Sequence, residues 1–423
     1  MIKYVVILFC CWLLAMQQSL QAQTPSLTLQ ESHALAIANY PMIKQHDLIA
    51  KSAQYAIEQA HTGYLPQINI NGQATYQSAV TQIPLQIPGI DVPSLSKDQY
   101  KLFGEVNQRL YDGGSIRLQK EAIEANAAVE EQALEVQLHD LKQRINQLFF
   151  GVLLLDAQLA QNDLLQKDLT TGLAKARAAI ANGSALKSSA DLLEAELLKA
   201  KQQTAELQAS RKAYIQVLGL FINRSLNEHT VLQQPEDISP NPDINRPELD
   251  WYASRQQGLG IEGKMLTAKN LPMVGLFLQG GVGRPALNML SNNMEAYYYG
   301  GVRLSIPISG FYTLRKERAL LGMRHKTIDV QRETFLFNTD LAVRQQTTEL
   351  QKYEQLLATD DTIIALRTSV KNAALAQLEN GVINTADYLR EVNAEDTAKV
   401  AKIRHEIQRL MTLYAIQHTT GNE

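Results

Sequence analysis

Two long stretches of this chain lack proline and repeat apolar residues with a coiled-coil period. Proline is absent from Ser94 to Gln234 and again from Ile308 to the end. In the first stretch, apolar residues alternate between spacings of four and three, as a coiled-coil seam requires: Leu134, Leu138, Leu141, Ile145, Leu148, Val152, Leu155 and Leu159. A helix from Gly113 to Ala181 would extend about 100 Å at 1.5 Å per residue. Such a helix cannot fold back on a compact core, so it must belong to a rod, a fibre or the wall of a tube.

The first residues have the order of a secretory signal peptide. Lys3 supplies a positive start, an apolar run of about 12 residues follows from Tyr4, and the segment ends at Ala22. The run is far shorter than the roughly 20 residues of a helical membrane span. We therefore expect export with cleavage after residue 22, and an N-terminal anchor is the alternative. Beyond this run, no segment is expected to cross a membrane as a helix.

Both cysteines, Cys10 and Cys11, lie inside the predicted signal peptide. The mature chain would carry no thiol, disulfide or cysteine metal ligand. Its net charge is −3 and its basic residues are spread along the chain, which does not indicate a nucleic-acid partner.

The mature chain reads as two copies of one unit. Four landmarks recur in the same order at a nearly constant offset of about 200 residues, which indicates a tandem duplication. They are Asn39-Tyr40-Pro41 with Asn245-Arg246-Pro247, Leu65-Pro66 with Leu271-Pro272, Asp112-Gly113-Gly114 with Ser309-Gly310-Phe311, and Asn182-Gly183 with Asn380-Gly381. We predict a first repeat over 23–233, a linker over 234–247 rich in Pro and Asp, and a second repeat over 248–423.

Each copy is predicted to contain a helix, a hairpin and two long helices. The first hairpin should occupy about 66–111, followed by helices over about 113–181 and 186–232. The second hairpin should occupy about 272–308, followed by helices over about 312–379 and 385–418.

The hairpins are predicted from alternation with a period of two. From Gln67 to Tyr76 apolar and polar residues alternate, and Val274, Leu276 and Leu278 share one face of a later strand. Each strand is about ten residues or slightly longer, which is the length that a tilted strand needs to cross a bilayer. Four strands cannot close a pore, and open edges cannot persist in lipid. Closure would therefore require several chains.

The pattern resembles the TolC-like family of outer-membrane efflux channels, over essentially the whole mature chain. The resemblance rests on the order of the duplicated landmarks, including Tyr111-Asp112-Gly113-Gly114 and the two reversals at Gly183 and Gly381. It implies a mixed α/β membrane protein: a homotrimer in which each chain gives four strands to one transmembrane β-barrel that continues into a long periplasmic helical barrel. It also implies a periplasmic adaptor, an inner-membrane pump of RND or ABC type, and contact with outer-membrane lipid.

In this family, carboxylates just past the second reversal line a constriction and help to hold it shut. Asp387 matches the first of the usual pair, whereas the second falls on Arg390, with Glu391 adjacent. The departure makes a salt-bridged gate possible in place of an acidic ring. Asp191 matches loosely in the first copy. For both Asp387 and Asp191 the alternative is a capping role at the start of the returning helix.

No motif for catalysis is present. The eight histidines, including His33, His46, His139 and His405, stand outside any HExxH or His–Asp pattern with ligand spacing. Gly280-Gly281-Val282-Gly283 lies inside an alternating strand and lacks the Lys-Ser/Thr ending of a phosphate loop. We expect no enzyme activity, cofactor or metal.

Two functions of different classes follow from these observations. The first is a passive exit duct for an efflux or type I secretion system, gated at the periplasmic helical tips. The second is a periplasmic coiled-coil scaffold or adhesin without a pore. Extraction distinguishes them, because only a channel requires detergent.

Overall fold

The computed structural model describes residues 26–81 and 94–422, so the predicted signal peptide lies outside the described residues. The chain divides into two compact units. Unit 2 comprises Lys44–Leu134 and Glu248–Thr334. Unit 1 comprises Glu135–Pro247, the described residues up to Ile43, and those from Phe335 onward.

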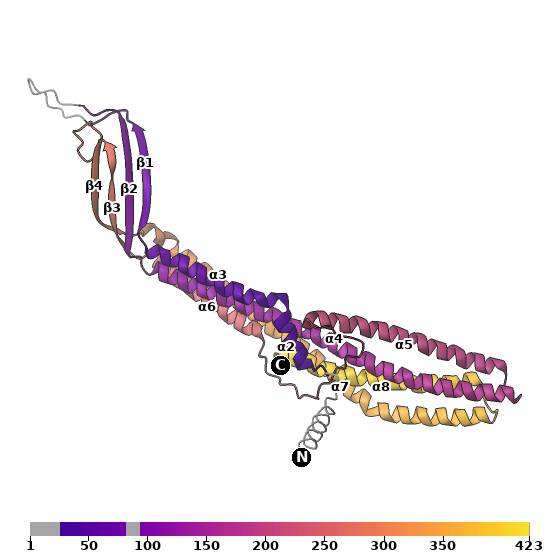
Figure 1. Ribbon diagram of the computed structural model, residues 1–423. Helices are drawn as coiled ribbons and strands as arrows, with labels where there is room; N and C mark the ends of the chain where they lie inside the picture. The colour runs from indigo at the N-terminus through magenta and orange to yellow at the C-terminus, as the bar shows by residue number, and fades with distance from the viewer. Residues whose placement is uncertain (1–25, 82–93, 423) are drawn as a thin grey trace, which may run out of the picture. The chain divides into compact units, whose positions relative to one another are not determined.

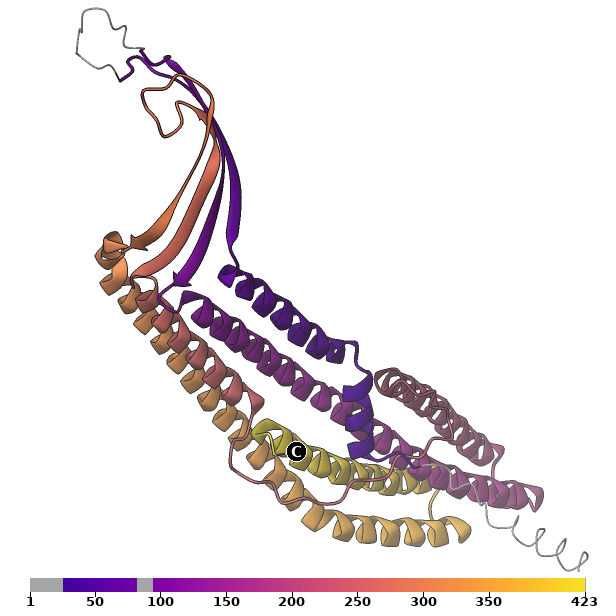
Figure 2. The same ribbon diagram turned by 60° about the vertical axis from the view of Figure 1, so that its left-hand side comes forward.

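Unit 2 contains one four-stranded antiparallel sheet in the order β1-β2-β3-β4, seen as four adjacent arrows in Figure 1. The strands are β1 (Gln67–Tyr76), β2 (Asp98–Tyr111), β3 (Met273–Arg284) and β4 (Glu295–Ser305). They contain 10, 14, 12 and 11 residues, which confirms the four predicted strands of membrane-spanning length. Figure 2 shows that the strands bend along their length. Each repeat contributes one hairpin, and β2 joins β3 across the repeats.

The register gives the sheet one apolar and one polar face. Ile68 pairs with Val106, Val106 with Leu278, and Leu278 with Gly300, so these residues share a face. On the other face, Asn69 aligns with Glu105, Gln279 and Tyr299. The apolar side chains are strongly exposed, with Ile70 and Tyr298 each 79% accessible. An apolar face of this size that lies open in a single chain must meet lipid or another chain.

Five tyrosines lie near strand ends, and they do not all lie on one face: Tyr100, Tyr111, Tyr297, Tyr298 and Tyr299. Tyr298 pairs with Gly280 on the apolar face, whereas its neighbours Tyr297 and Tyr299 pair with Gly281 and Gln279 on the polar face. An interfacial aromatic girdle therefore cannot include Tyr297 and Tyr299. A bulge between Arg109 and Tyr111 also shifts the register at the end of β2, next to the following helix.

The helices of unit 2 flank this sheet in sequence. They are α3 (Lys44–His61), α6 (Pro247–Ala268) and the first parts of α4 (Ser115–Ala181) and α7 (Phe311–Glu379). Pro247 is the first residue of α6, where the missing N–H of proline costs no hydrogen bond. Each strand that ends at the helical side is thus continued by a helix after one tight junction.

Unit 1 is built from α2 (Leu29–Asn39), α5 (Lys187–Ile222), α8 (Thr385–Thr420) and the remaining parts of α4 and α7. α4 reverses into α5, and α7 reverses into α8, at the same end of this unit (Figure 1). With 67 and 69 residues, α4 and α7 confirm the very long helices expected from the proline-free stretches.

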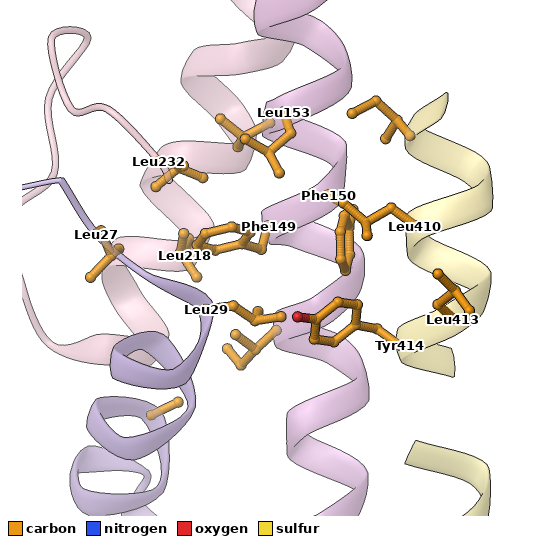
Figure 3. Packing of buried hydrophobic residues seen from close by; sticks show 14 of the residues in the cluster. Leu27, Leu29, Phe149, Phe150, Leu153, Leu218, Leu232, Leu410, Leu413 and Tyr414 are labelled. Carbon is orange, nitrogen blue, oxygen red and sulfur yellow. The ribbon is translucent and has the colours of Figure 1, made fainter. Parts of the chain in front are cut away.

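The heptad residues of α4 enter the largest core of unit 1. Leu141, Ile145 and Val152 are buried there, together with Phe149 and Phe150. Figure 3 shows the two phenylalanines on α4 between leucines of α2 and α5 on one side and residues of α8, including Leu410 and Tyr414, on the other. The centroids of the Phe150 and Tyr414 rings lie 5.4 Å apart. The seam thus joins helices of both repeats.

One described helix, α4, is long and apolar enough to cross a membrane by length and composition alone, contrary to the expectation that none would be. A third of its apolar stretch, 33%, is buried inside the single chain. Phe149, Phe150 and Val152 are almost completely buried against α5 and α8. Packing within unit 1 therefore accounts for part of the apolar stretch of α4.

The second helix of the first repeat ends ten residues before the predicted residue 232, because α5 stops at Ile222. Asn223 adopts a left-handed conformation with φ 52°, and Arg224 N–H donates to Gly219 O at 3.0 Å. The following extended segment is held against α8. Tyr414 Oη donates to Glu236 O at 3.1 Å, and Arg409 pairs with Asp237 at 2.6 Å.

Candidate functional site

The two helical reversals are built alike. Gly183 and Gly381 have φ values of +73° and +72°, a conformation that glycine adopts without a steric penalty. In the first reversal Ser184 N–H donates to Ala179 O at 2.9 Å, and in the second Val382 N–H donates to Gln377 O at 2.9 Å. These are Schellman endings that satisfy carbonyls of the last helical turn. Asn182 and Asn380 directly precede the glycines, as the sequence indicated.

The helices that return from the reversals begin differently. Asn384 caps α8, and its Oδ1 accepts from the backbone N–H of Asp387 at 3.0 Å. Asp387 is in the first turn, where its charge stabilises the positive helix end, but the capping side chain is that of Asn384. In the first copy, Leu186 occupies the cap position without a side-chain hydrogen bond. Asp191 is the fifth residue of α5 and exposed, which is past the positions that a cap contacts.

Arg390 binds two of the acidic residues near the second reversal. It contacts Asp387 at 3.3 Å and Glu391 at 3.2 Å. Arg367, on α7, contacts the other oxygen of Glu391 at 3.6 Å. Arg390 remains exposed, with 71% of its side chain accessible. The charges here alternate in sign, so this chain does not present an isolated acidic pair.

A more deeply buried ionic cluster lies about two turns further along the helices and was not predicted. Glu395 on α8 has only 4% of its side chain accessible and pairs with Lys371 of α7 at 2.7 Å. Lys371 also pairs with Asp168 of α4 at 2.9 Å. Thr368 and Lys399 complete the contacts of Glu395, at 2.6 and 3.1 Å. The cluster ties three helices together. The only sequence signal was that Glu395 continues the three-residue spacing of the apolar positions Leu389 and Val392.

Burial and hydrogen bonding act against each other in this cluster. Burial alone would raise the pKa of Glu395, but hydrogen bonds from Lys371, Thr368 and Lys399 outweigh it and lower the pKa. Burial alone would lower the pKa of Lys371, but hydrogen bonds to Glu395 and Asp168 raise it. The adjacent Asp396 differs, because burial raises its pKa despite a hydrogen bond from Gln161. Glu395 and Lys371 are thus held in their charged forms.

Two further contacts join α4 to the helices of the second repeat. Lys175 pairs with Glu379 at 2.8 Å, close to both reversals, and Gln161 donates to Asp396 at 2.9 Å. Between them, an apolar cluster packs α4, α5, α7 and α8 together. Its buried members are Leu169, Leu173, Ala190, Leu193, Leu197, Ala200, Ala374, Tyr388, Leu389 and Val392. Opening the chain at this end would require these contacts to separate.

The predicted strand-to-helix junctions lie in unit 2. Asp112 accepts from Gly114 N–H at 2.9 Å and from Ile116 N–H at 2.8 Å, so it caps α4. Gly113 has φ +69°, and a Cβ there would lie 2.8 Å from Leu271 Cβ. At Gly310 a Cβ would overlap the buried side chain of Asn270. Each junction therefore packs against the turn between α6 and β3, which explains why glycine is needed.

Two histidines that the spacing left unassigned have side-chain partners. His405 contacts Asp360 at 2.7 Å between α7 and α8, and His139 stacks on His418 with ring centroids 4.0 Å apart. Both contacts join helices of unit 1. Among residues 26–81 and 94–422, no group of three or more His, Cys, Asp or Glu side chains is arranged to hold a metal ion.

Comparison with known proteins agrees with this architecture. Residues 33–221 match the model of a family described as outer membrane efflux protein. This match covers the first repeat up to the end of α5 and shows that this part of the chain is similar to outer-membrane efflux proteins. The family described in this way is one of channels rather than of enzymes. No curated protein matches the chain significantly.

Solved outer-membrane channels share the fold of nearly the whole chain. The outer-membrane channel OprN aligns with a TM-score of 0.70 at 12% identity, covering 93% of this chain and 90% of that one. VceC from Vibrio cholerae gives 0.67 at 14%, covering 93% and 96%, and MtrE from Neisseria gonorrhoeae gives 0.68 at 15%, covering 93% and 88%. The second repeat, which lies outside the family match, is therefore included in the structural similarity.

Proposed function

We propose that this efflux protein is the passive exit duct of a tripartite efflux or type I secretion system. The observation that carries the proposal is the sheet: its apolar face is exposed, its opposite face is polar, and in the described chain the outer edges of β1 and β4 have no partner strand. Such edges cannot persist in lipid, so copies of the chain must close the sheet into a barrel. By family, the closed assembly is a homotrimer that receives solutes from an adaptor and an inner-membrane pump.

The scaffold or adhesin alternative makes a different prediction for extraction. A barrel protein remains with the outer membrane until detergent is added and then runs as a trimer that dissociates on heating. A scaffold would be released by aqueous buffer. Fractionation of cells that express the full chain, followed by electrophoresis with and without heating, decides between them. Recovery as a buffer-soluble monomer would refute the duct.

The gate of this duct is proposed to lie at the helical reversals and to be salt-bridged rather than acidic. Six reversals would meet in a trimer, and charges at such a narrow ring act on solutes at close range. Arg390 offsets Asp387 and Glu391 within each copy. The ring therefore carries less negative charge than two carboxylates per chain would give, and it should discriminate weakly between cations and anions.

Replacing Arg390 tests this gate. We expect Arg390→Asp to increase cation selectivity and to make the channel sensitive to block by a trivalent cation from the periplasmic side, because the counter-charge is removed. Planar-bilayer recordings of reversal potential and block would measure both. Arg344→Asp, an exposed arginine elsewhere on α7, is the control and should leave both unchanged. If Arg390→Asp and Asp387→Ala alter only thermal stability, these residues stabilise the start of α8 and do not form the gate.

A further inference from the structure

Three aromatic side chains gather on the polar face of the sheet, where the alternation would place water-facing residues. The ring of Phe277 meets Tyr299 edge-on, with centroids 5.9 Å apart. Tyr297 follows at 6.4 Å from Tyr299, with the two rings nearly parallel. We call Phe277, Tyr297 and Tyr299 the aromatic track. Tyr297 and Tyr299 lie two residues apart on β4, and Phe277 lies on the neighbouring strand β3.

The register separates the track from the lipid-facing surface. Phe277 aligns with Gly301 and Asn107, and Tyr299 aligns with Gln279 and, through it, Glu105. These neighbours are small or polar. Tyr298, between the two tyrosines, points to the apolar face with Val282 and Ala296 nearby in the register. The rings of the track are therefore not part of the surface that meets the membrane.

The glycines that pair with the track allow close packing beside its rings. A Cβ at Gly301 would lie 3.3 Å from the ring of Phe277. A Cβ at Gly281, which pairs with Tyr297, would lie 2.2 Å from the carbonyl oxygen of Leu102. It would also lie 2.6 Å from Phe103 Cβ, so no side chain fits at Gly281, and Phe103 of β2 lies beyond it on the same face as Tyr297. The hydroxyl of Tyr299 donates to Gln279 Oε1, which fixes the orientation of this ring.

A cationic group stands at one end of the track. The guanidinium of Arg303 lies 4.7 Å from the centroid of Phe277, within the range of a cation–π contact. Arg303 also contacts Glu105 at 3.4 Å, yet 57% of its side chain remains accessible. Arg109, on the same face beside Gly275, adds a second positive charge at this end. A solute with a flat ring and an anionic group could therefore contact an aromatic ring and a positive charge at the same time.

We propose that the aromatic track is a transient binding site for planar aromatic anions that pass through the pore. This inference rests on the proposed duct function, in which the polar face lines the lumen. The ring of the solute stacks on Tyr297 and Tyr299, and its carboxylate meets Arg303. Stacking on an aromatic side chain tolerates many ring systems, so the site favours a chemical class and not one molecule.

The test uses 2-naphthoate as probe and single-channel recordings of the full assembly in planar bilayers. We expect naphthoate to cause brief, concentration-dependent current interruptions in the natural protein. Tyr299→Leu and Tyr297→Leu should each weaken this effect at least about tenfold, since roughly 1–3 kcal/mol of stacking is lost. Tyr298→Leu, the adjacent tyrosine on the opposite face, is the matched control and should retain the interruptions.

Two further probes define what would overturn the proposal. Cyclohexanecarboxylate, which has the charge without the flat ring, should act much more weakly than naphthoate. Naphthylmethylammonium, which has the ring with the opposite charge, should also act more weakly, and Arg303→Gln should remove that difference. Equal effects of all probes, or no interruption in a conducting channel, would refute the track. Absence of any conductance would instead refute the duct itself.

Discussion

Ile70→Lys is expected to prevent insertion or trimer formation, whereas Asn71→Lys should be tolerated. The two residues are neighbours near the middle of β1 and point to opposite faces, Ile70 with Gly104 and Asn71 with Phe103. A lysine on the lipid side near the bilayer midplane costs about 2–4 kcal/mol. This cost recurs in every copy of a closed barrel. On the polar side the ammonium group would remain in water.

The measurement is the fraction of each variant recovered from outer membranes as a heat-dissociable trimer. Ile70→Leu serves as a control for repacking on the same face and should behave as the natural protein. If Ile70→Lys and Asn71→Lys were recovered equally, the apolar face would not meet lipid.

Lys371→Met should destabilise the helical unit strongly. It removes one partner of a nearly buried ion pair and leaves Glu395 without its closest counter-charge. Breaking a buried pair in this way costs about 3–5 kcal/mol, and the lower end applies because Lys399 and Thr368 still contact Glu395. Arg177→Met breaks an exposed pair with Glu194 and should cost at most about 1 kcal/mol.

Combining Lys371→Met with Glu395→Gln tests the cause. The double variant should be more stable than Lys371→Met alone, because a neutral amide of the same size replaces the unpaired buried carboxylate of Glu395. The temperature at which the trimer is lost in detergent is measured for four proteins: the natural protein, Lys371→Met, Glu395→Gln and the double variant. Additive losses would mean that the two side chains do not interact.

Acid should loosen the same cluster. Since the folded state lowers the pKa of Glu395 below its usual 4.5, its stabilisation is present above that value and is lost as the pH falls through the folded pKa. Lys371, whose pKa is raised above 10.5, loses its contribution only at strongly alkaline pH. Asp396 has the opposite effect on stability. Because burial raises its pKa in the folded state, protonation of Asp396 as the pH falls stabilises the fold. Glu395→Gln should flatten the acid side of the stability profile.

The sequence alone was enough to predict the helices and strands, but not the polar contacts between them. Alternation along β1 and β3 identified the faces correctly because the side-chain period of a strand is fixed. The heptads of α4 identified the seam of Leu141, Ile145 and Val152 for the same kind of reason. The two positive-φ glycines marked both reversals. These features are local, so a single sequence contains them.

The remaining features depend on which residues distant in sequence become neighbours. Asp168, Lys371 and Glu395 lie on three helices, and nothing in their local spacing brings them together. The end of α5 at Ile222 was missed because Asn223 takes the left-handed cap that glycine usually occupies. Tyr297 and Tyr299 lie near a strand end in the sequence, but the residues that they face depend on the register of β4 with β3.

Conductance of the purified protein tests the central claim most directly. The mature chain, extracted in detergent and added to a planar lipid bilayer, should insert as a trimer and give uniform single-channel steps. Opening of the reversals, for example in Lys371→Met, should enlarge or lengthen these steps. A protein that forms no trimer and never conducts, although it retains the helical and strand content described here, would contradict the account.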